Sequence, residues 1–165
     1  MIRPTATARR AFPRKHERPP MTMPESDPTA ARPDGAYAKT TRAITVSVQP
    51  TFLRDQSTPE EGHFVWAYHV RIENHSNRAV RLLDRYWRIT DSHGRVQEVR
   101  GEGVVGKQPT LIPGDAFEYT SGTPLATPSG FMTGSYQMEG ENGERFEVEV
   151  PVFSLDSPHQ PSRLN

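Results

Sequence analysis

The residues with the clearest potential for chemistry are three glycines in the segment from 99 to 109. Gly101, Gly103 and Gly106 match the spacing G-x-G-x-x-G, which binds a pyrophosphate when the glycines lead from a strand into a helix. Arg100 and Lys107 flank the glycines with positive charge. These five residues are therefore the candidate binding residues for a small anion such as pyrophosphate.

The sequence after the glycines does not support a dinucleotide site. Pro109 and Pro113 follow within seven positions of Lys107, and proline prevents the helix that the motif requires. Two interpretations remain. The glycine N–H groups could form a nest that binds, or helps to hydrolyse, a pyrophosphate-containing ligand, although Glu102 opposes this with its charge. Alternatively, the glycines permit positive φ and close backbone approach where the chain crosses between sheets, and we favour this structural interpretation.

The histidines and carboxylates do not form a recognisable metal or catalytic site. His63, His69 and His75 are six residues apart in an extended segment, which separates neighbours by about 20 Å. His75 and His93 lie in turn sequences and could meet at one end of the fold, but two ligands make a poor site. Five glutamates gather near the C-terminus, where a solvated face is favoured over a Mg²⁺ site: Glu139, Glu141, Glu144, Glu147 and Glu149. No nucleophile motif is present, so neither an enzyme nor a cofactor is expected.

The overall composition excludes several classes of protein. The 165 residues carry 20 basic and 20 acidic side chains, so no net field attracts nucleic acid. There is no cysteine, which suits a reducing compartment, and no apolar run long enough to cross a membrane. We expect a cytoplasmic protein that is a monomer or a weak homo-oligomer.

The distribution of proline, charged and apolar residues divides the chain into three regions. Residues 1–36 are rich in proline and arginine and nearly lack large apolar residues, so we expect a disordered tail or a misassigned start. Residues 37–156 form one domain and residues 157–165 a C-terminal tail. Within the domain, apolar residues alternate with polar ones in runs starting at Ile44, Phe64, Gly134 and Phe146, the last with Val148, Val150 and Val152 facing inward.

These runs predict an all-β fold, an antiparallel β-sandwich of about seven short strands. The run from Val80 to Thr90 changes phase, which predicts a β-bulge near Leu82 and Leu83. Asn142-Gly143 between two runs predicts a hairpin turn. Trp66 and Trp87 are the expected anchors of the core.

Several ordered blocks of the domain resemble the ApaG family. They include Trp66-Ala-Tyr-His-Val70, the 99–109 segment, Phe117-Glu-Tyr-Thr-Ser-Gly122 and Met132-Thr-Gly-Ser-Tyr-Gln-Met138. The resemblance implies a fibronectin type III-like, immunoglobulin-like sandwich and a protein-binding module, in a family linked to cobalt resistance and magnesium efflux. The expected function is therefore noncatalytic binding of a protein partner, through the block from Arg100 to Gly122. Thr123 stands where many relatives are expected to have cysteine, so no cysteine-dependent role carries over.

Overall fold

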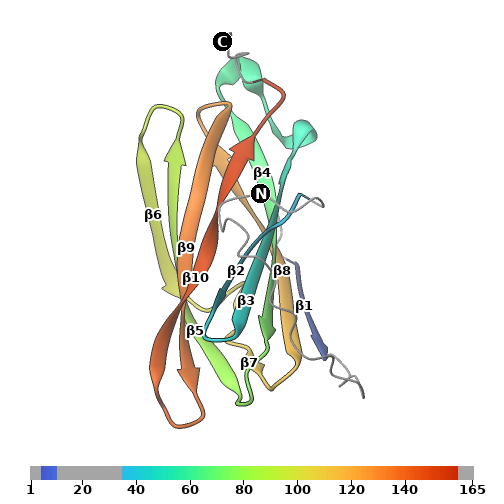
Figure 1. The fold of residues 1–165 in the computed structure, drawn as a ribbon. Helices are drawn as coiled ribbons and strands as arrows, with labels where there is room; N and C mark the ends of the chain where they lie inside the picture. The colour runs from blue at the N-terminus through green and yellow to red at the C-terminus, as the bar shows by residue number, and fades with distance from the viewer. Residues whose placement is uncertain (1–4, 11–34, 160–165) are drawn as a thin grey trace, which may run out of the picture.

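Alternation of apolar and polar residues makes strands with one face for a core and one for water. In the computed structural model, which describes residues 5–10 and 35–159, these strands form two antiparallel sheets that pack face to face (Figure 1). The described residues contain no α-helix and no helix that could span a membrane. The predicted β-sandwich is confirmed.

The first sheet has five strands in the order β1-β8-β4-β3-β2. Their bounds are β1 Thr5–Arg10, β8 Asp115–Leu125, β4 Phe64–Asn74, β3 Ile44–Phe52 and β2 Tyr37–Thr41. Two short 3₁₀ helices, η1 Arg54–Gln56 and η2 Pro59–Glu61, lie in the connection between β3 and β4.

The second sheet has the order β10-β9-β5-β6, and a short strand β7 pairs with the start of β5. The bounds are β10 Arg145–Asp156, β9 Ser129–Gly140, β5 Val80–Asp91, β6 Val96–Glu102 and β7 Thr110–Leu111. The chain passes from β6 of this sheet, through the glycine segment and β7, to β8 of the first sheet. The glycine motif lies between β6 and β7, which both pair with β5 of the second sheet, and the chain crosses to the first sheet only between β7 and β8. The prediction that the glycines lie in a crossing between sheets is therefore wrong.

Both tryptophans lie in the core between the sheets, as the sequence predicts. Trp66 and Trp87 are 1% and 3% exposed. The Trp66 indole N–H also donates to the carbonyl of Asp156 at 2.9 Å, which joins β4 of one sheet to the end of β10 in the other. Across the same core the hydroxyls of Tyr119 and Tyr136 form a hydrogen bond of 2.5 Å.

The structure contains one β-bulge that the sequence predicts and one that it does not. The register of β5 against β9 shifts between Leu82 and Asp84, which confirms the first. A second shift lies between Val150 and Phe153 in β10. Even-numbered residues face the core before this shift, and odd-numbered residues face the core after it. Val152 is therefore 41% exposed while Phe153 is buried, so the prediction that Val152 faces inward is wrong. The Asn142-Gly143 turn is confirmed, with Gly143 at a φ of 79°.

Both ends of the domain carry more structure than the sequence predicts. Thr5–Arg10, inside the tail predicted for residues 1–36, pairs with β8 in antiparallel register. Apart from Gly35 and Ala36, the rest of the predicted tail lies outside the described residues. At the other end Ser157 is buried and donates to the carbonyl of Pro128 at 2.6 Å, and the His159 ring packs against Phe52. The first residues of the predicted C-terminal tail therefore belong to the domain.

Candidate functional site

The glycine segment forms a tight turn at the end of β6. Gly103 and Gly106 adopt positive φ values of 66° and 77°. Val104 and Lys107 exchange backbone hydrogen bonds of 2.8 and 2.9 Å, and the Gly103 N–H donates to the carbonyl of Leu83 at 2.7 Å. The amides of Gly103, Val104 and Lys107 thus donate to backbone carbonyls, and the first of these is a glycine amide of the predicted anion nest. The positive φ of both glycines and the close backbone approach at Gly103 match the conformational role expected of them.

Gly101 has a different role, because a side chain from the neighbouring strand covers it. It lies opposite Arg85 in the β5–β6 ladder. A Cβ at position 101 would come within 2.8 Å of the Arg85 guanidinium. That guanidinium donates to the carbonyls of Glu102 and Gly103 at 3.1 and 2.9 Å. The carbonyl oxygens of Glu102 and Gly103 in the turn therefore bind a cationic side chain of the same protein, the Arg85 guanidinium.

The two flanking cations, Arg100 and Lys107, do not converge on one point beside the three glycines. The Arg100 side chain lies on the outer face of the sheet, with its guanidinium carbon 4.3 Å above the centre of the Tyr86 ring. Lys107 is exposed in the turn itself. Binding of pyrophosphate by the five residues stays a prediction, and the occupied amides do not favour it.

The block from Arg100 to Gly122, expected to contact a partner, does not form one surface. Within it Val104, Leu111, Phe117 and Tyr119 are buried core residues. The outer side of β6 and the exposed turn at Ile112 are parts of the block that reach the surface. They lie apart, because β7 pairs with the first residues of β5, whereas the part of β6 inside the block pairs with the middle of β5.

The outer face of β6-β5-β9-β10 holds a shallow hollow of about 630 Å³ beside the glycine turn. Tyr86 lies near its centre, between Arg100 on β6 and Ser135 on β9. Its hydroxyl donates to Glu98 at 2.7 Å, and this hydrogen bond raises the pKa of the Tyr86 phenol. Further lining residues include Asp84, Gln137, Arg145 and Glu147. The hollow combines an aromatic ring with charges of both signs.

An apolar row continues the same face beyond the hollow. The register aligns Val96 of β6, Thr90 of β5 and Phe131 of β9 across the sheet. Val96 is 47% exposed and Phe131 is 45% exposed. On β10 the register places Ser154 opposite Phe131, and the exposed Val152 lies two residues before Ser154. Sequence reasoning missed this surface, although the adjacent pair Phe131-Met132 in one strand signals that one large apolar side chain must face outward.

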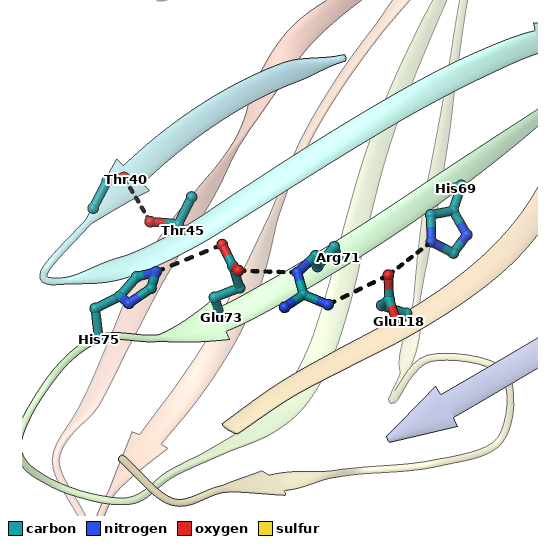
Figure 2. A network of polar contacts seen from close by, with 7 residues as sticks. All are labelled: Thr40, Thr45, His69, Arg71, Glu73, His75 and Glu118. Atoms are coloured by element: carbon teal, nitrogen blue, oxygen red, sulfur yellow. Dashed lines mark hydrogen bonds and ion pairs between the residues drawn. The ribbon is translucent and has the colours of Figure 1, made fainter. Parts of the chain in front are cut away.

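A polar network occupies the outer face of the other sheet (Figure 2). Arg71 lies between two carboxylates, with its Nε 2.9 Å from Glu73 and its Nη1 3.5 Å from Glu118. His69 and His75 complete the chain at 3.2 Å from Glu118 and 3.5 Å from Glu73. Burial acts to raise the pKa of Glu118, but the His69 hydrogen bond and the Arg71 charge outweigh it and lower that pKa. The arrangement is an ion-pair ladder.

The other candidate metal ligands are held apart. His75 follows β4 near the start of β5, whereas His93 follows the end of β5, so the strand separates them by about 40 Å. Among residues 5–10 and 35–159, no group of three or more His, Asp or Glu side chains is placed to hold a metal ion. Four of the five C-terminal glutamates contact basic side chains or a backbone amide: Glu139 with Arg145, Glu141 with the Ala79 N–H, Glu144 with Arg42 and Glu149 with Lys39.

Comparisons with known proteins agree with the resemblance in the sequence. The model of the ApaG domain matches residues 54–140. Proteins named ApaG from Paramagnetospirillum magneticum and Rhodospirillum centenum are 63% and 64% identical over 129 residues, 78% of this chain and 99% of theirs. A crystal structure of an ApaA protein from Bordetella pertussis, 51% identical, covers 71% of this chain and 95% of its own, with a TM-score of 0.69. The chain therefore belongs to the ApaG domain family.

Proposed function

We propose that this protein is a noncatalytic binding module whose outer β6-β5-β9-β10 face docks a protein partner. The observation that carries the proposal is the row of exposed apolar side chains Val96, Phe131 and Val152. Exposed apolar side chains gathered in one place mark interaction surfaces more often than scattered ones do. In this proposal, the link to divalent-cation handling that the family resemblance implies runs through the partner and not through coordination by this chain.

The polar part of the same face supports a protein ligand over a small molecule. Tyr86 and Arg100 are of the residue types enriched in the energetic centres of protein interfaces. They stack on each other beside the apolar row. A partner that covers Phe131 would reach both of them, since Phe131 and Tyr86 lie on the same face of neighbouring strands.

Substitutions on this face test the proposal. The double change Phe131→Ser and Val152→Ser removes exposed apolar surface without opening the core, so stability should change by less than about 0.5 kcal/mol. Ile112→Ser is the matched control, because Ile112 is 42% exposed near the other end of the molecule. It also tests the loop part of the predicted Arg100–Gly122 surface.

The measurement is affinity capture with the full chain, followed by titration of the captured partner against each variant. We expect the wild type and Ile112→Ser to bind one partner in constant stoichiometry. The double variant should bind at least about tenfold more weakly, since a buried aromatic anchor contributes 2 kcal/mol or more. Equal binding by the double variant, or loss on Ile112→Ser alone, would refute this docking face.

A further inference from the structure

The edge of the first sheet along β8 has a hydrogen-bonding pattern that can be assigned residue by residue. The Leu53 N–H donates to the Val65 carbonyl, and the Gly114 N–H donates to the Asn74 carbonyl, both at 2.8 Å. Residues of an antiparallel strand direct their N–H and C=O alternately to the two neighbours. Even-numbered residues of β4 therefore bond to β8, and odd-numbered residues bond toward β3.

The register then sets the directions on β8. Tyr119 and Phe117 lie opposite Val70 and Ile72, so they bond to β4. Their neighbours Ala116, Glu118 and Thr120 direct their backbone groups to the other edge, where the ladder places Arg9, Thr7 and Thr5. Strand β1 is thus held through the backbone of these three residues, while Ala6 and Ala8 direct their N–H groups away.

The edge of β8 is longer than the strand that covers it. β1 pairs as far as Thr120, whereas β8 continues to Leu125. In the described chain no strand pairs with Gly122 or Pro124 on that side. Beside them lies a hollow of about 720 Å³, lined by Gln56, His63, Val65, Ser121, Gly122, Thr123 and Pro124. A longer strand on this edge would gain contacts that β1 does not make.

We propose that the β8 edge is a strand-addition site for an extended peptide segment of a partner, and that β1 is its displaceable intramolecular cover. Backbone hydrogen bonds supply the affinity in such complexes, and alternate side chains supply the selectivity. β1 is suited to displacement because residues 5–10, TATARR, contain no large apolar side chain. An uncovered edge of this kind is also an aggregation hazard, which gives the cover a second use.

The register defines the peptide that fits. Small residues belong opposite Tyr119 and Phe117, where β1 has Ala6 and Ala8. A residue opposite Gly122 lies on the outer face and extends over the hollow beside Val65. An apolar side chain at that position distinguishes a competing peptide from the resident strand. The expected partner segment is therefore extended, with two small residues in alternate positions and one apolar anchor three positions before the first of them.

Amide hydrogen exchange of the full chain tests whether β1 covers the edge. Thr7→Pro removes the N–H that faces Glu118, whereas Ala8→Pro, the matched control, removes one that faces away from β8. We expect the Ala116, Glu118 and Thr120 amides to lose protection in Thr7→Pro and to keep it in Ala8→Pro. The Phe117 and Tyr119 amides should stay protected in both, because they bond to β4. Unchanged protection in Thr7→Pro would overturn the proposal.

Peptide binding tests whether the edge accepts a strand in trans. The probe is a labelled peptide of residues 1–12, added to full-length wild type, Thr7→Pro and Ala8→Pro. It should bind Thr7→Pro at least about tenfold more tightly than the other two, in which a tethered strand competes at high effective concentration. An Arg3→Leu peptide, which places leucine opposite Gly122, should bind about tenfold more tightly still.

Three further outcomes would overturn the proposal. One is binding of the probe to wild type and Thr7→Pro with equal affinity, and another is binding to neither. The third is a wild-type dimer, seen by light scattering, that becomes monomeric in Thr7→Pro, because it would show that β1 pairs with a second copy. The Phe131 surface is on the other sheet, so these results do not depend on the proposed docking face.

Discussion

At the scale of single residues, the three glycines of the motif should respond differently to the same substitution. A Cβ at Gly103 would lie 2.5 Å from the carbonyl oxygen of Lys107, a backbone atom, and its φ is positive. At Gly106 only the positive φ opposes alanine, since nothing lies within 4 Å. Gly106→Ala should therefore cost about 1 kcal/mol of unfolding free energy, and Gly103→Ala about 3 kcal/mol or more.

Urea denaturation of the two variants measures this difference. Gly101→Ala should fall between them, because the obstacle is the flexible Arg85 side chain, which would give up its hydrogen bonds to the turn. Equal losses at all three positions would contradict the roles assigned here. A loss of pyrophosphate binding without a loss of stability would instead revive the anion site.

The buried tyrosine pair allows a second prediction at this scale. Tyr119 and Tyr136 are almost fully enclosed, and burial raises the pKa of both phenols well above the ordinary value. Either Tyr→Phe change leaves one hydroxyl without its partner, at a cost of about 1–3 kcal/mol. The double change removes both, so its cost should be smaller than the sum of the two. Thermal unfolding of the four proteins measures the coupling, and simple additivity would contradict it.

At the scale of the strands, the ion-pair ladder formed by Arg71, Glu73 and Glu118 on β4 and β8 should make the free energy of unfolding depend on pH. The pKa of Glu118 is lowered in the folded state, so its contribution is present above its ordinary value of 4.5 and is lost as pH falls through the lower folded value. Unfolding free energy should fall on acidification below about pH 5. Glu118→Gln should show a smaller fall, whereas Glu61→Gln, an exposed control in η2, should follow the wild type. Parallel curves for all three would contradict the role of the ladder.

The strands also show what the sequence could predict. Ile44, Val46 and Val48 alternate strictly and are all fully buried, because a core on one side imposes a period of two. The bulge at Leu82 was visible because the phase changes between two large apolar residues. The bulge before Phe153 could not be predicted, since Val152 continues the apolar-polar alternation of Val148 and Val150 in the sequence, whereas its side chain is exposed in the structure. Strand β1 was missed because its alternation involves only threonine and alanine, which carry little burial energy.

The candidate site was predictable only in part, for a related reason. The glycine motif depends on local backbone geometry, so its neighbouring prolines were enough to exclude a helix. The outer face around Tyr86 and Phe131 is assembled from two hairpins, β5-β6 and β9-β10, that β7 and β8 separate in sequence. Its residues become neighbours only through the register of β5 with β6 and β9, which no local pattern specifies.

At the scale of the whole molecule, the two sheets leave two outer surfaces with different properties. One carries the apolar row and the Tyr86–Arg100 stack. The other carries the ion-pair ladder (Figure 2) and the β8 edge (Figure 1). Because a shared core separates them, a substitution on one surface should not change binding at the other. The proposed partner and the proposed peptide could then occupy the protein together.

The integrity of both surfaces depends on the core that joins the sheets, and Trp66 contacts residues of both sheets. It is 1% exposed, packs edge-on against Phe52 and bonds to the carbonyl of Asp156. Trp66→Ala should lower the unfolding free energy by about 3–5 kcal/mol, a large part of the 5–15 kcal/mol typical of a domain. Trp66→Phe keeps most of the volume but loses the hydrogen bond, so it should cost about 1–2 kcal/mol. Trp87 fluorescence can follow unfolding in both variants, and an unchanged transition in Trp66→Ala would show that this residue does not join the sheets.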